Sequence, residues 1–263
     1  MELDHLASAI ISVYSQFDAQ HYFQEGFGYH CVDEGHVGGR VGKDVNAYLL
    51  RKAGKAELWP PRAEAGYSED DLFDLIEFMF DCVGKPLEGG YHSYYNCGYH
   101  YSKFEKEVGQ EEFQREVNEI LRQYSTGFEL SKGGEVLAVA ESGFESLVEQ
   151  ELPEYDPENV EGRVKAAVKK FRYRRALLED RREAVRDLVD VLEYLRPQMK
   201  EKFASRDESD LFNIANNFAL RHHNPQQKSD YDPEIWLDWM FYFYLSTISA
   251  VLRMINRGSK GIK

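Results

Sequence analysis

The chain has 263 residues, of which 43% are hydrophobic and 14% aromatic, and its formal net charge is −14. This length allows one large domain or two ordinary ones, and the apolar and aromatic content excludes a wholly disordered chain. The first residues already include Glu2 and Asp4, unlike a secretory signal peptide, and the three cysteines cannot all pair with one another. We therefore expect a cytoplasmic protein with free thiols.

The charge is distributed unevenly along the chain. Residues 1–162 contain 12 Lys and Arg against 32 Asp and Glu, a balance of −20, whereas residues 163–263 contain 20 against 14, a balance of +6. Such a change of sign favours separate modules and places any polyanion-binding surface in the second half. A solvated acidic module beside a mildly basic one would give the same counts. We predict an acidic N-terminal α+β module, 1–157, a basic C-terminal helical bundle, 158–258, and a disordered tail, 259–263.

The predicted N-terminal module combines helices with segments rich in glycine. Apolar residues at helical spacing predict helices over about residues 6–17, 44–51, 68–84, 110–124 and 144–152. Ser68 followed by Asp71 resembles a capping box, and the Ser131-Lys-Gly-Gly turn between apolar runs predicts a small β-hairpin. Residues 86–101, dense in Gly and Tyr, are expected to form a loop. The acidic surface of this module is a candidate site for a protein partner.

From Glu158 onward the apolar residues repeat at helical spacing. Four helices are expected, around Val164–Phe171, from Ala184 until Pro197 kinks or ends the helix, over Asp210–His222, and from Pro233 to about Asn256. Short connections between four helices favour an antiparallel bundle, so the fold class is mainly α.

The last predicted helix is long and apolar enough to require a test for a membrane span. Ile235–Ile255 has 21 residues, sufficient to cross a bilayer. It also contains Asp238, Arg253 and several hydroxyl side chains, and the chain has no second such segment. We therefore expect burial in the bundle or in a dimer contact, and no membrane insertion.

The C-terminal half offers two candidate functional sets. The densest basic run is Lys169, Lys170, Arg172, Arg174 and Arg175, which is a candidate RNA-binding surface because cations that contact phosphates dominate nucleic-acid affinity. A solvated helix facing the acidic module is an equally good explanation of this run. The second set consists of Asn217, Arg221, His222 and His223 near a predicted helix end.

The second set contains the groups that metal-free RNA cleavage requires. Histidine can accept or donate a proton at the 2′-hydroxyl, and arginine can stabilise the charge that develops on the phosphate. Asn217 and Arg221 share one helical stripe because they are four residues apart. Basic side chains at a helix C-terminus also simply complement its dipole, and His222 is a candidate core residue by helical phase.

Three stretches of the C-terminal half resemble prokaryotic abortive-infection proteins of the HEPN superfamily. They are Leu178-Glu-Asp-Arg-Arg-Glu-Ala-Val to Leu195-Arg-Pro, Leu211-Phe-Asn-Ile-Ala-Asn-Asn-Phe-Ala-Leu-Arg-His-His-Asn, and Tyr231-Asp-Pro-Glu-Ile-Trp-Leu-Asp-Trp-Met-Phe-Tyr. The resemblance covers about residues 160–257. It implies a helical bundle, a homodimer formed through that bundle, and metal-independent endoribonuclease activity in toxin or antiphage systems.

The chain departs from the usual signature of that superfamily, an Arg followed after four to six residues by His. No Arg in this chain has a His at that distance, and Arg221 is followed at once by His222 and His223. Two functions therefore stay open: a defence ribonuclease that uses Arg221 with His222 or His223, and a non-catalytic module that binds RNA or protein and dimerises.

The N-terminal half contains scattered histidine and cysteine residues. Cys97-x-x-His100 together with Cys31 and His36 could form a tetrahedral zinc set. The spacings match no standard zinc finger, and the surrounding segments are rich in Tyr, Phe and Gly. We therefore predict neither a metal ion nor a cofactor.

Overall fold

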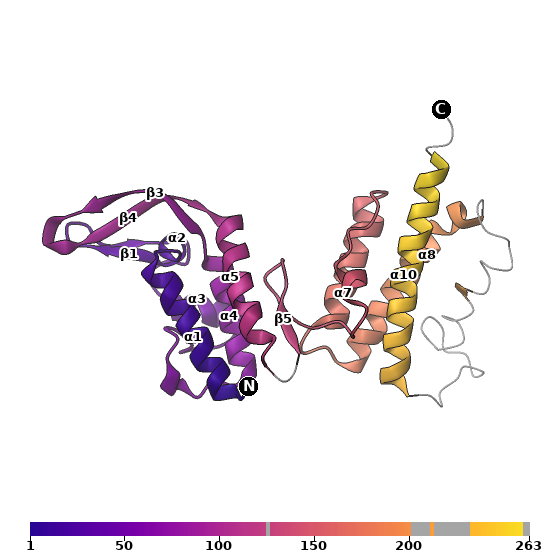
Figure 1. Ribbon diagram of the computed structural model, residues 1–263, viewed down its shortest axis with the longest axis horizontal. Coiled ribbons are helices and arrows are strands. Elements are labelled where there is room, and N and C mark those ends of the chain that lie inside the picture. The colour runs from indigo at the N-terminus through magenta and orange to yellow at the C-terminus, as the bar shows by residue number, and fades with distance from the viewer. Residues whose placement is uncertain (125–126, 201–210, 213–231, 260–263) are drawn as a thin grey trace. The chain divides into compact units, whose positions relative to one another are not determined.

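The computed structural model describes residues 1–124, 127–200, 211–212 and 232–259 (Figure 1). The chain forms two compact units, Met1–Leu137 and Ala138–Lys263, each with its own apolar core. The described residues are mainly helical with small antiparallel hairpins, as predicted. The boundary between the two units therefore lies earlier in the chain than the predicted end of the N-terminal module at residue 157. Residues of the intervening segment, Leu147, Leu152 and Tyr155, pack against the second core.

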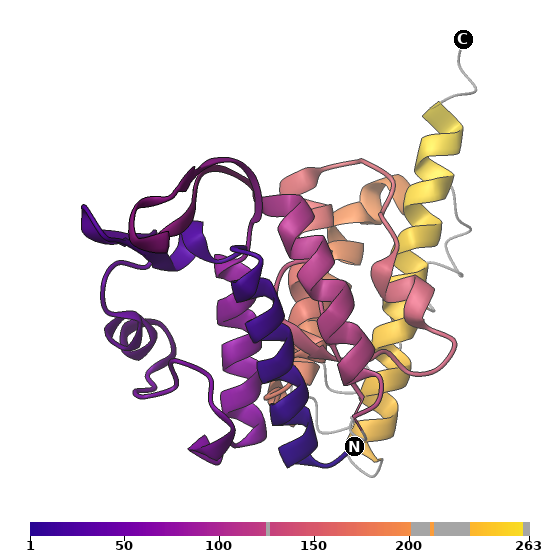
Figure 2. The same ribbon diagram turned by 60° about the vertical axis from the view of Figure 1, so that its left-hand side comes forward.

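Three helices form the core of the first unit: α1 (Leu3–Ala19), α4 (Glu69–Cys82) and α5 (Lys106–Leu121). They lie side by side in Figure 2 and pack on one another through an apolar face. The predicted capping box starts α4, since the Ser68 hydroxyl accepts from the Asp71 amide and the Asp71 carboxylate accepts from the Ser68 amide. Smaller helices complete the unit: α2 (Gln24–Phe27), α3 (Val45–Ala53), η1 (Ala63–Ala65) and η2 (Tyr94–Asn96).

Two antiparallel hairpins extend from this helical core. One pairs β1 (Gly28–Cys31) with β2 (Gly35–Gly38), and the other pairs β3 (Lys85–His92) with β4 (Gly98–Glu105). The prediction of a loop over residues 86–101 was therefore wrong. The strands are held by cross-strand aromatic pairs such as Tyr91 with Tyr99, whose rings lie 5.2 Å apart.

The third hairpin, β5 (Phe128–Leu130) with β6 (Val136–Ala138), confirms the prediction of a hairpin around the Ser131-Lys-Gly-Gly turn. Gly134 in this turn has a φ of +89°, and a Cβ there would lie 2.4 Å from the Phe80 ring. Only glycine therefore fits this position without displacing the core.

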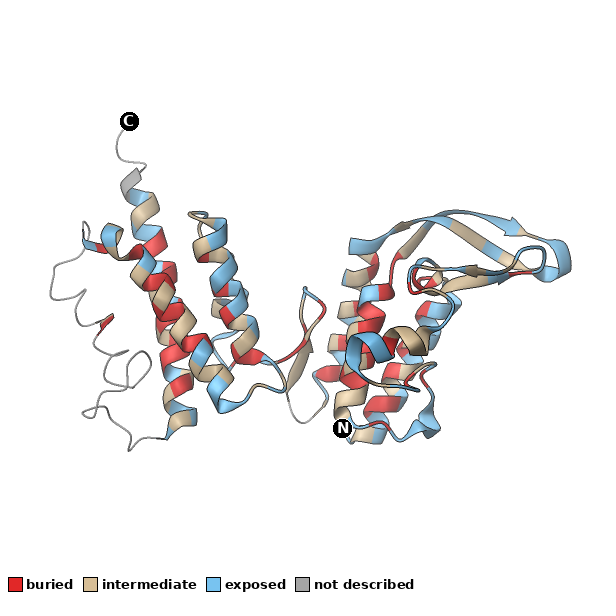
Figure 3. Cartoon of the chain, turned by 180° about the vertical axis from the view of Figure 1, so that it is seen from behind, coloured by how far each residue is buried: buried red, intermediate tan, exposed pale blue. Residues whose placement is uncertain are grey.

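The second unit contains α6 (Glu145–Glu149), η3 (Pro157–Glu161), α7 (Gly162–Arg172), α8 (Leu178–Lys200) and α10 (Pro233–Ser259). Helix α8 packs against both α7 and α10. The rings of Phe171 and Phe241 stack with centroids 3.9 Å apart and link α7 to α10. Figure 3 shows the buried residues along the facing sides of these helices.

Two helices in this unit extend past their predicted ends. Of the two alternatives predicted for Pro197, a kink or a helix end, the end is excluded, because α8 continues through Pro197 to Lys200, the last described residue of that stretch. A proline removes only one backbone hydrogen bond, and the fully buried side chains of Leu195 and Met199 hold this turn against the core. Helix α10 extends to Ser259, the first residue of the predicted tail; the remaining tail residues, 260–263, lie outside the described part.

Helix α10 is long and apolar enough to cross a membrane, and just over half of its apolar stretch is buried within the structure. Phe241 and Leu245 are almost inaccessible to solvent, and Trp239 is 42% exposed. Each of these side chains is therefore at least half buried. Asp232 caps the helix by accepting from the Glu234 amide, 3.0 Å away. Burial of this kind is typical of a core helix.

Candidate functional site

The predicted catalytic residues Asn217, Arg221, His222 and His223 lie outside the described residues. The two residues just before Asn213 are described and pack against the second core. Phe212 is 5% exposed and lies beneath the Arg196 guanidinium, which is 4.5 Å from its ring centroid. The Tyr244 hydroxyl donates to the Leu211 carbonyl at 3.4 Å. The chain is thus anchored to α8 and α10 at the start of the segment that carries these residues.

Two members of the predicted basic run hold α7 in its unit. Lys170 Nζ lies 2.6 Å from Asp187 Oδ2 on α8 and 3.7 Å from Glu183 Oε2, and its hydrogen bond to Asp187 raises the pKa of the ammonium group. Arg172 is buried, and its Nε donates to the Ala138 carbonyl at 2.9 Å. Both cations therefore have a structural role in this arrangement.

The other three members are closer to solvent. Lys169 and Arg175 are exposed, and Arg174 lies over the Tyr173 ring at 5.8 Å. The five cations of this run therefore lie in different surroundings. They do not form one uniform surface for a ligand.

A partly buried ion pair lies near the C-terminal end of α7. The Arg181 guanidinium of α8 binds the Asp238 carboxylate of α10 and lies 4.5 Å from the centroid of the Phe171 ring. Burial raises the pKa of Asp238 to about 6, while the charge of Arg181 opposes that shift and Glu141 adds to it. This cluster ties α7, α8 and α10 together.

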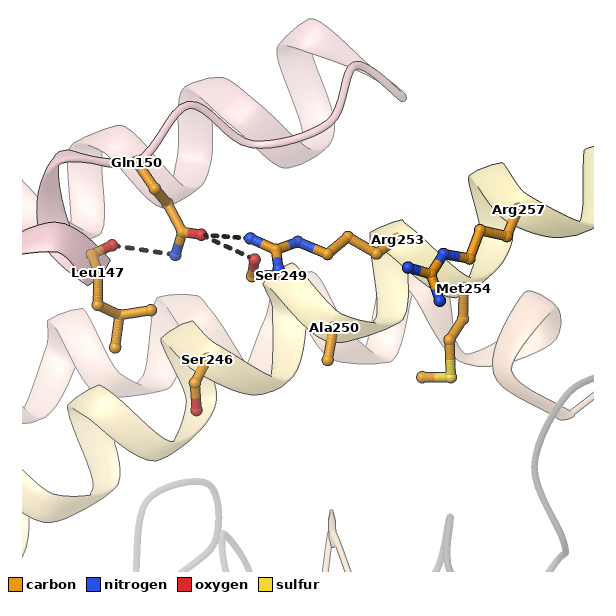
Figure 4. Close-up of a pocket in the computed structure, with 8 residues that line it drawn as sticks. All are labelled: Leu147, Gln150, Ser246, Ser249, Ala250, Arg253, Met254 and Arg257. Carbon is orange, nitrogen blue, oxygen red and sulfur yellow. Dashed lines mark hydrogen bonds between the residues drawn. The ribbon is translucent and has the colours of Figure 1, made fainter.

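A groove runs along the C-terminal half of α10 (Figure 4). It has a volume of about 430 Å³ and is lined by Leu147, Gln150, Ser246, Ser249, Ala250, Arg253, Met254 and Arg257. The α10 residues recur once or twice in each successive turn, so they form a single stripe.

Gln150, the residue after α6, closes one side of the groove. Its Oε1 accepts from Ser249 Oγ at 2.9 Å and from Arg253 Nη2 at 3.4 Å, and its Nε2 donates to the Leu147 carbonyl at 3.1 Å. Arg253 and Arg257 lie one helical turn apart, and both are exposed. Because no carboxylate is among the eight lining residues, the two guanidinium groups are presented to an anion. The hydroxyls of Ser246 and Ser249 instead donate to the Phe243 carbonyl and to Gln150 Oε1.

The spacing of Ser246, Ser249, Arg253 and Arg257 was a usable sequence signal. It was missed because the polar residues of this segment were weighed only as obstacles to a membrane span. Gln150 had no such signal, since tertiary packing brings it to α10 from 99 residues away.

In the first unit, three of the four residues considered for zinc come together. Cys31, Cys97 and His100 are joined by His92, with their ligand atoms all within 4.8 Å of one another. His36 instead faces His30 across the β1–β2 hairpin. Cys31, Cys82 and Cys97 form no disulfide.

Comparison with known proteins gives no family model, no curated protein and no solved structure that matches this chain.

Proposed function

We propose that this chain is a prokaryotic defence or toxin protein whose C-terminal unit binds and cleaves RNA as a metal-independent endoribonuclease of HEPN type. The observation that supports the RNA-directed part is the groove on α10, where Arg253 and Arg257 lie one helical turn apart and no carboxylate is among the lining residues. Arginine side chains are common partners of nucleic-acid phosphates. The α10 side of the groove lies within the region that resembles the superfamily.

The bundle expected for this superfamily supports the same proposal. Helices α7, α8 and α10 share one core, and Leu211 and Phe212 pack on it at the start of the segment proposed as the fourth helix. In the proposed fourth helix, Arg221 and His223 would lie about two and a half and about three turns beyond Phe212. In the proposed mechanism Arg221 stabilises the developing phosphate charge, and one histidine transfers the proton of the 2′-hydroxyl.

A homodimer through the C-terminal unit is part of the proposal. Exposed apolar side chains recur in the N-terminal part of α10 at Ile235 and Trp239, which are 66% and 42% exposed. Apolar residues exposed on one helix favour an interface with another chain. The bundle of a second copy is the partner that the resemblance implies.

The groove is tested by RNA binding across a range of salt concentrations. The double variant Arg253→Gln/Arg257→Gln is expected to weaken single-stranded RNA binding about tenfold at low salt and to reduce the salt slope by about 0.7 for each lost phosphate contact. Arg163→Gln is a matched control, because Arg163 is an exposed arginine elsewhere on the same unit. Equal affinity and slope in both variants and the wild type would remove the groove from the proposal.

The alternative function, a non-catalytic binding module, is favoured by the missing Arg-to-His spacing. It predicts the same loss of affinity in the groove variant. Only the cleavage of RNA by the wild type separates the two functions.

A further inference from the structure

Four metal-ligating side chains of the first unit converge between its two long hairpins. Cys31 ends β1, His92 ends β3, Cys97 directly precedes β4, and His100 lies within β4. Their ligand atoms are all within 4.8 Å of one another. Cysteine and histidine in a set of four are the ligands that Zn²⁺ prefers.

The distances between these atoms fit a tetrahedral ion. Zinc bonds of about 2.3 Å to sulfur and about 2.05 Å to nitrogen place two such ligands about 3.6 Å apart at the tetrahedral angle. Here Cys31 Sγ lies 3.8 Å from His92 Nδ1, and Cys97 Sγ lies 3.3 Å from His100 Nε2. Both separations lie within about 0.3 Å of the expected value.

The groups around the cluster orient the ligands as they do in metal sites. His92 Nε2 lies 3.2 Å from the Asp33 carboxylate, which directs Nδ1 toward the cluster and matches the carboxylate–histidine arrangement of zinc proteins. The Tyr29 ring stacks on His100 with centroids 4.2 Å apart. The Val32 amide donates to Cys97 Sγ at 3.4 Å and so helps to fix the position of that sulfur.

The two hairpins bury little of their surface, since Cys31 is the one buried residue in their four strands. Each is a two-stranded sheet, and an isolated two-stranded hairpin is marginally stable in water. Tyr91, Tyr95 and Tyr99 on the β3–β4 hairpin are each about half exposed or more. Cys31, by contrast, is 5% exposed at the point where the hairpins meet. An ion at this point would supply the missing cross-link.

We propose that Cys31, His92, Cys97 and His100 bind one Zn²⁺ in a closed structural site that joins the two hairpins. Four protein ligands leave no open coordination position, so the ion stabilises the fold and does not activate water. This inference is independent of the proposed RNA-directed function, because all four ligands belong to the first unit.

The metal content of the purified full chain tests the proposal. We expect one zinc per chain by elemental analysis and native mass spectrometry, and a tetrahedral thiolate spectrum when Co²⁺ replaces Zn²⁺. The variant Cys97→Ser should lose both signals, whereas His36→Ala should keep both, because His36 is exposed on the same hairpin pair and outside the cluster. Chelation should lower the Tm of the wild type and of His36→Ala, but not that of Cys97→Ser.

Thiol labelling of the wild type keeps the proposal falsifiable if Cys97→Ser does not fold. Cys31 and Cys97 should be protected from alkylation in the zinc-loaded protein and become reactive after chelation. Cys82 serves as an internal reference, since burial raises the pKa of its thiol to about 12 and keeps it unreactive in both states. Wild-type protein that holds no more zinc than Cys97→Ser, or that contains a Cys31–Cys97 disulfide, would overturn the proposal.

Discussion

Asp238 on α10 has a carboxyl whose pKa is shifted in the folded protein. It is partly exposed and pairs with Arg181 of α8, and burial raises the pKa of its carboxyl to about 6. Its usual pKa is about 3.9, so the folded state binds this proton more tightly than the unfolded state. The stability that this proton contributes is fully present below about pH 4 and is lost as the pH rises through about 6.

Asp238→Asn is therefore expected to gain stability relative to the wild type as the pH rises from 4 to 7. The relative gain should be about 1–2 kcal/mol, allowing for the partial exposure of the side chain. Chemical denaturation of both proteins at several pH values measures it. A difference in unfolding free energy that stays constant across this range would show that the folded pKa of Asp238 is not raised.

At the scale of single elements, helix starts could be predicted from the sequence more easily than contacts between distant segments. Ser68 with Asp71 and Asp232 with Pro233 marked helix starts correctly because capping depends on neighbouring residues. The β3–β4 hairpin was missed because it is exposed on both faces and so has no alternation of apolar and polar residues. His92 was not predicted as a member of the cluster because it is 61 residues away from Cys31 in the sequence.

The β5–β6 hairpin gives a direct test of element packing. Gly134→Ala is expected to destabilise the first unit by about 2–3 kcal/mol, because the residue has a positive φ and its Cβ would overlap the Phe80 ring. Gly143→Ala is the matched control: Gly143 has a φ of +95° with nothing within 4 Å of a Cβ, so only the conformational cost of about 1 kcal/mol is expected. Equal losses in the two unfolding free energies would exclude a steric role for Phe80.

At the scale of the whole molecule, the sequence charge pattern was informative only in part. It predicted an anion-binding surface in the second half, but the densest basic run includes Lys170 and Arg172, which bond to their own unit. Charge density in a sequence does not show which cations a fold will pair internally. The groove arginines, Arg253 and Arg257, are only two among the basic residues of that half, and their placement depends on how α6 packs against α10.

The proposed histidine roles differ between two neighbouring residues. By helical phase His222 continues the apolar face of Leu211 and Phe218, so His222→Ala is expected to lower the Tm of the protein. His223→Ala is expected to lose about 10²-fold or more in cleavage rate with an unchanged Tm, as a general acid or base would. Rates and melting temperatures measured on the same preparations distinguish these roles, and a His223→Ala protein of wild-type rate would remove that residue from the mechanism.

Cleavage of RNA by the purified wild type and by Arg221→Ala in Mg²⁺-free buffer tests the central claim most directly. A cation that faces the developing phosphate charge contributes a few kcal/mol to the transition state, so Arg221→Ala should lose at least tenfold in rate while Arg163→Ala retains the wild-type rate. RNA binding measured in parallel should remain salt-dependent in all three proteins. A wild type that binds RNA but cleaves none, or an Arg221→Ala variant that folds and cleaves at the wild-type rate, would contradict the proposed ribonuclease.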